Sequence, residues 1–281
     1  MGYPMAGHLA RAGHRVRVYN RTRARAEAWL SEYGSPEAGD LAESPAAAVA
    51  DAEVVFVCTG NDDDLRQVVL AAGDGALGAM PAGAILVDHT TASPAIAREL
   101  ASQAAARGVG FLDAPVSGGQ AGAENGALTV MLGGEPAAYH DVALLLDCYA
   151  RKHLLMGPAG AGQLTKAVNQ ICIAGVLQGL SEGLRFAERA GLDGERVVEV
   201  ISQGAAQSWQ MDNRAETMLE GSFDFGFAVD WMRKDLAIAM AQAQTMGVAL
   251  PLAELVDGFY AQLQARGGGR LDTSSLIELL R

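Results

Sequence analysis

The chain has 281 residues, half of them hydrophobic, which is enough for a large core in one or two domains. Its formal net charge of −12 excludes a broad basic surface for nucleic acid or anionic membranes. Cys58, Cys148 and Cys172 follow no CxxC spacing, so we predict reduced thiols and no metal site. No apolar run reaches the length of a membrane span and no signal peptide is recognisable, so we expect a cytoplasmic protein.

Short β-branched segments alternate with alanine-rich segments over residues 1–156. The predicted strands are 15–20, 53–59, 84–90, 110–114, 128–133 and 152–156. The predicted helices between them lie at about 22–33, 64–71, 94–107 and 135–149. This alternation predicts a parallel sheet with helices on both faces, and the continuously apolar stretches 54–57 and 85–87 predict interior strands.

Strand signals stop at Gly157. The helical segments that follow are 163–190, 193–202, 208–220, 227–246, 251–265 and 273–280. We therefore predict an α/β domain with a doubly wound sheet over 1–156 and an all-α domain over 157–281, joined by a long helix. This helix is apolar nearly all round at 171–177, which predicts that it is buried there.

Near the start of the long helix stands Lys166, with Gln163 and Asn169 three residues to either side on the same helix face. The positive end of the helix dipole and desolvation both favour the neutral form of a lysine. Such a lysine can donate or accept a proton near neutral pH. An ordinary solvated lysine at a helix start explains the pattern equally well.

Four motifs resemble those of the β-hydroxyacid dehydrogenases, in the family's order and spacing. They are DHTT at 88–91, DAPVSGG at 113–119, GAGQLTKAVN at 160–169 and KDL at 234–236. The resemblance covers nearly the whole chain and implies a Rossmann-type cofactor domain followed by a helical domain. It also implies hydride transfer between a nicotinamide cofactor and a small anionic substrate, a β-hydroxyacid or its semialdehyde.

The resemblance implies a role for each matching residue. Lys166 is the expected general acid/base, and Asn169 is expected to hold a substrate oxygen. Ser117, Gly118 and Gly119 are expected to bind the substrate, since a loop poor in side chains offers N–H groups and a hydroxyl to a carboxylate. An ordinary turn is the alternative for this Ser-Gly-Gly loop.

The cofactor residues are expected after the strands of the first domain. Asn20, Arg21 and Thr22 follow the strand at 15–20, where an acidic residue would favour NAD(H) and an arginine favours the 2′-phosphate of NADP(H). No acid stands there, so we expect NADP(H) to be preferred over NAD(H). The resemblance also places Thr91 and Lys234 against the cofactor. A solvated lysine paired with Asp230 is the alternative for Lys234.

The glycine-rich fingerprint that should follow a first strand is incomplete. Gly2 matches its third glycine, while the first strand and first two glycines are absent. We expect about ten further residues before Met1, forming the central strand of the sheet between the strands at 15–20 and 84–90.

Two other functions remain open at this point. One is an imine reductase, which shares the fold but usually lacks a lysine at the position of Lys166. The other is a catalytically impaired paralogue, suggested by the incomplete fingerprint. The long 6-phosphogluconate dehydrogenases are related, but a histidine continues their lysine motif, whereas Gln170 follows Asn169 here. Family members form subunit contacts through the helical region, so we expect a homodimer or homotetramer.

Overall fold

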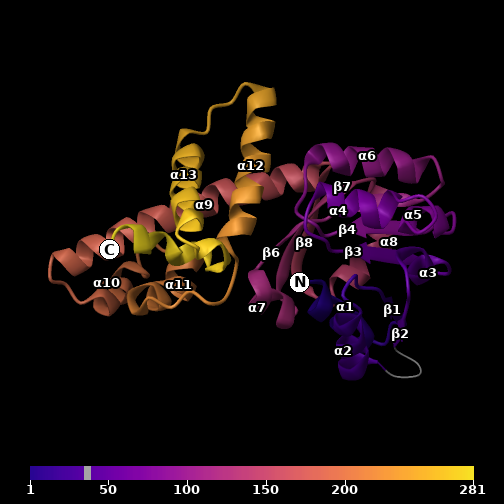
Figure 1. The fold of residues 1–281 in the computed structure, drawn as a ribbon, viewed down its shortest axis with the longest axis horizontal. Helices are drawn as coiled ribbons and strands as arrows, with labels where there is room; N and C mark the ends of the chain where they lie inside the picture. The colour runs from indigo at the N-terminus through magenta and orange to yellow at the C-terminus, as the bar shows by residue number, and fades with distance from the viewer. Residues whose placement is uncertain (35–38) are drawn as a thin grey trace. The chain divides into compact units, whose positions relative to one another are not determined.

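The computed structural model describes residues 1–34 and 39–281, which form two compact units, Met1–Lys166 and Ala167–Arg281 (Figure 1). The division falls inside helix α9 (Ala161–Arg189), whereas the sequence analysis placed the domain boundary ahead of this helix, at 156/157. Lys166 is therefore the last residue of the first unit, and Asn169 belongs to the second.

A six-stranded sheet lies at the centre of the first unit. Its strands are β3 (Val54–Val57), β4 (Ile85–Asp88), β5 (Gly110–Asp113), β6 (Val116–Ser117), β7 (Leu128–Gly134) and β8 (Ala150–Gly157). The order is β3-β4-β5-β7-β6, and β8 also pairs with β7. The first three strands are parallel, which confirms the predicted class, whereas β7 runs antiparallel to β5 and makes the sheet mixed.

Two further strands, β1 (Val16–Val18) and β2 (Gly39–Leu41), form a separate parallel pair. Among residues 1–34 and 39–281, no ladder joins this pair to the larger sheet, whose path ends at β3. The expectation that the strand at 84–90 would lie beside the strand expected before Met1 is wrong, because β4 pairs with both β3 and β5. The prediction of an interior strand holds for β4, which is buried throughout. It is wrong for β3, because this end strand alternates half-buried and buried residues.

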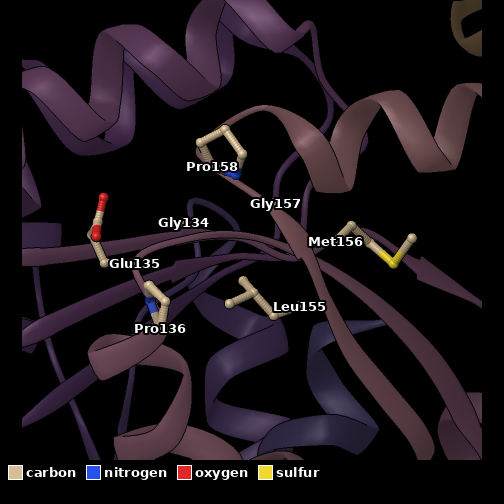
Figure 2. A pocket seen from close by; sticks show the side chains of 7 residues that line it. All are labelled: Gly134, Glu135, Pro136, Leu155, Met156, Gly157 and Pro158. Carbon is tan, nitrogen blue, oxygen red and sulfur yellow. The ribbon is translucent and has the colours of Figure 1, made fainter.

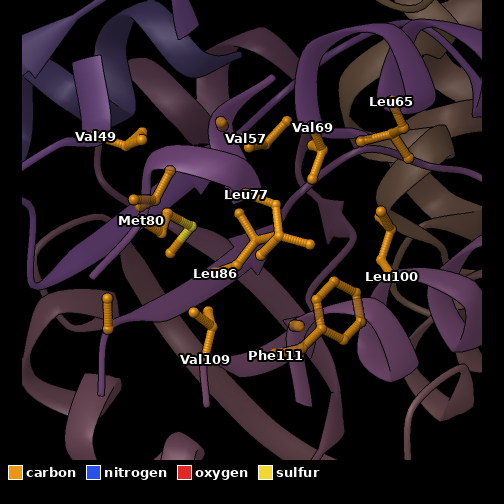
Figure 3. Close-up of a cluster of buried hydrophobic side chains, with 14 of the residues drawn as sticks. Val49, Val57, Leu65, Val69, Leu77, Met80, Leu86, Leu100, Val109 and Phe111 are labelled. Atoms are coloured by element: carbon orange, nitrogen blue, oxygen red, sulfur yellow. The ribbon is translucent and has the colours of Figure 1, made fainter. Parts of the chain in front are cut away.

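The helices of the first unit cover both faces of the sheet, as predicted. They are α1 (Gly2–Arg11), α2 (Arg23–Tyr33), α3 (Pro45–Val49), α4 (Asp62–Leu65), α5 (Ala76–Ala79), α6 (Pro94–Ala105), α7 (Gly119–Glu124) and α8 (Pro136–Leu146), with a π-helical turn at Arg66–Leu70 after α4. Leu86 belongs to one hydrophobic cluster, with Leu100 and Phe111 (Figure 3), while Ile85 and Val87 belong to another. Alternate side chains of β4 thus point into two cores.

The second unit is helical, as predicted. After α9 come α10 (Gly194–Ile201), α11 (Trp209–Glu220), α12 (Val229–Met246) and α13 (Pro251–Ala265), followed by 3₁₀ turns at Gly268–Arg270 and Thr273–Leu279. The last predicted helix is therefore 3₁₀ rather than α. Leu177, Met232, Leu236 and Tyr260 form the centre of its core.

Helix α9 has 29 residues and a length of about 43 Å. Within its apolar run, Ala174 and Leu177 are buried, whereas Cys172 and Val176 are exposed. The prediction that 171–177 is buried all round is therefore wrong for the single chain, because the core of the second unit covers only one side. Among the described residues, no helix is both long and apolar enough to span a bilayer.

Candidate functional site

The loops that follow the parallel strands carry most of the residues expected at a cofactor site. Asn20, Arg21 and Thr22 come after β1, and Thr91 comes after β4. The loops after β3 and β4 are joined, because the Thr59 N–H donates to Thr90 Oγ1 at 3.0 Å. Carboxyl ends of parallel strands are where open α/β sheets bind their ligands.

Arg21 is an exposed cation at this edge, with 77% of its side chain accessible. Its Nη1 lies 3.3 Å from Asp64 Oδ1 on α4. Asn20 Oδ1 accepts the Thr22 N–H at 2.8 Å, which shapes the turn that presents Arg21. A guanidinium has five N–H donors, so the contact with one carboxylate leaves donors for a phosphate.

Gly2 lies where α1 meets the end of β3. A Cβ at this position would be 3.3 Å from Cys58 Cβ, closer than an ordinary van der Waals contact. The close helix–strand packing expected of the third fingerprint glycine therefore holds at Gly2, while its contact with a cofactor stays a prediction.

The start of α9 is held by the carboxylate of Asp113, at the end of β5. Its Oδ1 accepts the Gly160 N–H at 2.7 Å and its Oδ2 accepts the Gln163 N–H at 2.9 Å. A Cβ on Gly133 or Gly162 would come within 2.5 and 2.8 Å of these oxygens, so only glycine fits. Burial raises the pKa of Asp113 to about 6, although the N–H donors oppose this shift.

Gln163 ties the first turn of α9 to the loop after β4. Its Oε1 accepts the Ala92 N–H at 3.0 Å, and its Nε2 donates to the Thr90 carbonyl at 2.7 Å. Lys166, three residues further on, is only 7% exposed, so it is not an ordinary solvated lysine. Asp113 and Gln163 fix the backbone that carries Lys166. The sequence analysis placed Gln163 on the helix face of Lys166 but assigned it no such role.

Beneath these loops, the buried pair Asp88 and His89 supports the site from inside. His89 Nδ1 donates to the Ala114 carbonyl at 2.6 Å, so its Nε2 is the acceptor for the Tyr149 hydroxyl at 2.8 Å. Burial lowers the pKa of His89 to about 4 and raises that of Asp88 to about 7. Both ring nitrogens of His89 have partners, so its role here is structural.

Ser117 ends β6, Gly118 caps α7 and Gly119 is its first residue, with all three half-buried. Positive φ angles of 128° and 64° at the two glycines explain why no side chain is found there. Figure 2 shows a different hollow of the first unit, of about 390 Å³, beside the ends of β7 and β8. None of the predicted site residues lines it.

In the second unit, a buried polar chain connects the two site residues predicted there. Asn169 Nδ2 donates to Gln170 Oε1 at 2.8 Å, and Gln170 Nε2 donates to Asp235 Oδ2 at 2.8 Å. The other oxygen of Asp235 lies 3.2 Å from Lys234 Nζ. Gln170 and Asp235 are 2% and 3% exposed. The sequence analysis gave neither a role, although each directly follows a predicted site residue.

Comparison with known proteins gives matches along both units. Residues 1–157 match the family described as the NAD binding domain of 6-phosphogluconate dehydrogenase. Residues 160–280 match the family described as NAD-binding of NADP-dependent 3-hydroxyisobutyrate dehydrogenase.

Three similar proteins extend over nearly the whole chain. An uncharacterized oxidoreductase of Shewanella frigidimarina is 60% identical, over all of this chain and 94% of its own length. A probable 3-hydroxyisobutyrate dehydrogenase-like protein of Arabidopsis thaliana is 40% identical, over 99% of this chain and 81% of its own. The structure of 3-hydroxyisobutyrate dehydrogenase from Mycobacterium tuberculosis with L-serine is 30% identical, with a TM-score of 0.88 over 100% of this chain and 96% of its own.

Proposed function

The chain belongs to the β-hydroxyacid dehydrogenase family of NAD(P)-dependent oxidoreductases, and from this premise we propose that it interconverts a small β-hydroxyacid and its semialdehyde, using NADP(H). Lys166 is the general acid/base of this reaction. The substrate is anionic, and its carboxylate binds at Ser117, Gly118 and Gly119. The family resemblance, rather than any geometry unique to this chain, supports the choice of substrate class.

The observation that carries the proposal is the anchored, buried position of Lys166. In the oxidation direction, the neutral amine takes the hydroxyl proton of the substrate while the carbinol hydrogen leaves as hydride. In the reduction direction, the ammonium returns this proton to the carbonyl oxygen. When bound, the nicotinamide supplies or accepts the hydride. Asp113 and Gln163 hold the helix start from which the Lys166 side chain extends, and this backbone is the same for both directions.

The substrate-binding assignment rests on the chemistry of the Ser-Gly-Gly loop. The hydroxyl of Ser117 and the backbone N–H groups of Gly118 and Gly119 are donors, and a carboxylate is purely an acceptor. Asn169 would then hold the reacting oxygen, one helical turn beyond Lys166 on α9.

A preference for NADP(H) is supported by Arg21. An exposed guanidinium after β1 suits a 2′-phosphate, and the residues that precede and follow it, Asn20 and Thr22, are uncharged. Gly2, Thr91 and Lys234 complete the proposed cofactor site. The matches with 3-hydroxyisobutyrate dehydrogenases along the chain favour hydroxyacid chemistry over imine reduction.

The test is a steady-state comparison of kcat/KM for glyoxylate and for succinic, methylmalonic and tartronic semialdehydes, with NADPH and with NADH. We expect at least one semialdehyde to be reduced, with NADPH preferred. Reduction of cyclic imines alone would replace this function with imine reduction. Absence of both NADPH binding and turnover would identify a catalytically impaired paralogue.

A further inference from the structure

The polar chain of the second unit has a direction that its chemistry dictates. A carboxylate only accepts hydrogen bonds, so the buried Asp235 requires the amide nitrogen of Gln170 to face it. The oxygen of Gln170 must then point the other way, where it accepts from Asn169 Nδ2. Asn169 consequently directs its own oxygen, Oδ1, away from this chain.

Asp235 acts on a second group at the same time. Its Oδ1 lies 3.2 Å from the ammonium of Lys234, whose Nζ also lies 5.6 Å from the centre of the Trp231 ring. These contacts limit where the flexible lysine side chain can place its charge. One carboxylate therefore sets the orientation of an amide on α9 and the position of an ammonium on α12.

We propose that Gln170 and Asp235 are positioning residues for the reaction, which hold Asn169 and Lys234 in the orientation that the reaction needs. The inference rests on the proposed function, since it assigns these two residues to the same site. It adds that Asn169 offers its Oδ1 as an acceptor to a hydroxyl or ammonium hydrogen. An isolated exposed asparagine would present oxygen and nitrogen equally.

Kinetics provide the first test. Gln170→Leu removes the hydrogen bonds of Gln170 to Asn169 and Asp235 and replaces it with an apolar side chain of similar size. We expect kcat to fall about 3- to 10-fold, the range for one neutral hydrogen bond, while the KM for the semialdehyde changes less than about twofold. Gln170→His should restore most of kcat, because a neutral imidazole also donates with one nitrogen and accepts with the other. Gln178→Leu, which removes another buried glutamine of α9, should leave kcat unchanged.

A double-mutant cycle separates positioning from simple loss of stability. Asp235→Asn lets the hydrogen-bond series Asn169–Gln170–Asp235 run in either direction and also removes the charge beside Lys234, so kcat should fall at least as far as in Gln170→Leu. The double variant should then lose little more than Asp235→Asn alone. Fully additive losses, or failure of Gln170→His to exceed Gln170→Leu, would refute the proposal.

Proton exchange at the side-chain amide of Asn169 provides an independent test by NMR. The resonances of this amide are assigned as those that are missing in Asn169→Ala. In the wild-type protein and in Gln170→His, one of its two protons should exchange with water markedly more slowly than in Gln170→Leu. Equal exchange in all three would overturn the proposed orientation. This measurement needs no turnover, so it decides the orientation even if every semialdehyde proves inert and the proposed function fails.

Discussion

Lys166 is the residue on which the proposed chemistry depends most directly. Lys166→Ala should lower kcat by about 10²- to 10⁴-fold, the contribution of a positioned acid/base, while NADPH binding is retained. Lys152, which is exposed on β8, gives a matched control: Lys152→Ala should keep wild-type kcat. Steady-state kinetics and a fluorescence titration with NADPH measure both quantities. A loss below about tenfold would assign the proton transfer to another group.

Arg21 should decide between the two nicotinamide cofactors. Arg21→Asp places a carboxylate where a 2′-phosphate would bind, and this carboxylate can accept the 2′-hydroxyl of NAD(H) instead. We expect the ratio of kcat/KM for NADPH to that for NADH to fall by at least about tenfold, since one charged contact is worth roughly 1.5–3 kcal/mol. Arg25→Asp makes the same charge change at another exposed arginine, in the first turn of α2, and should leave the ratio as it is. An unchanged ratio in Arg21→Asp would remove Arg21 from the site.

Asp88 should make the stability of the first unit depend on pH. Its pKa is raised to about 7 by burial, so the folded chain keeps a proton that the unfolded chain releases near pH 4. The stabilisation from this neutral form is complete below pH 4 and is lost as the pH rises through about 7. Asn cannot ionise, so Asp88→Asn should gain about 3 kcal/mol relative to wild type between pH 5 and pH 8.

Urea unfolding at both pH values measures this gain, because any pH-independent cost of the asparagine cancels in the difference. The neighbouring His89 has the opposite sign. Its pKa is lowered to about 4, so its contribution is intact above pH 6.5 and is lost as the pH falls. A difference between wild type and Asp88→Asn that stays constant with pH would mean that Asp88 is ionised in the folded chain.

At the scale of the element, the start of α9 depends on a carboxylate from another strand. Asp113→Ala leaves the N–H groups of Gly160 and Gln163 without their acceptor, which costs about 1–3 kcal/mol for each buried group. We expect a lower melting temperature and a kcat that falls more than the KM changes, because Lys166 loses its fixed backbone. Asp193→Ala removes the capping carboxylate of α10 instead, and should lower stability without changing kcat.

Wild-type kcat in Asp113→Ala would show that the remaining anchor, the side chain of Gln163, is sufficient to place Lys166. Equal kinetic losses in Asp113→Ala and Asp193→Ala would attribute the effect to general loss of stability.

The sequence predicts long elements better than short ones. The helices α9, α12 and α13 have many residues each, so their periodicity and their Pro and Gly boundaries are evident. The two-residue strand β6 and the three-residue strand β2 are too short to show any period. The antiparallel position of β7 depends on pairing with β5, which local sequence does not encode.

The same limit applies to the site. Motifs marked Lys166, Asn169 and Lys234, because each stands in a recognisable local pattern. Asp113, Gln163 and Asp235 stand in the same motifs, but no motif indicates which distant residue each of them binds: Gln170 and Asp235 are 65 positions apart, and Asp113 and Gln163 are 50 apart. Such pairs are brought together only by the packing of whole helices and strands, so their hydrogen bonds became visible in the structure alone.

At the scale of the whole molecule, we propose that the chain forms a homodimer or homotetramer through its helical unit. Val176 on α9 and Leu252 on α13 are 38% and 52% exposed, and Leu252 also lies against Gly175 of α9. Exposed apolar side chains grouped in this way are typical of subunit interfaces. Val176→Glu combined with Leu252→Glu should shift the molar mass from light scattering to that of the monomer.

Leu144→Glu, at an exposed leucine of the first unit, should leave the molar mass unchanged. A wild-type chain that is monomeric at micromolar concentration would rule this proposal out.

The position of β3 at the end of the sheet should also affect how fast its backbone amide hydrogens exchange with solvent. In a parallel ladder, alternate residues bond to the same neighbour, and the carbonyl oxygens of Glu53 and Val57 accept hydrogen bonds from the β4 side, from the N–H groups of Ile85 and His89. Val54 and Phe56 therefore direct their amides away from β4, towards the side where no strand of the described residues pairs. The amide hydrogens of Val54 and Phe56 should exchange with deuterated solvent after at most a local opening of this sheet edge. The amide hydrogen of Val87 in β4 should exchange only when the entire first unit unfolds.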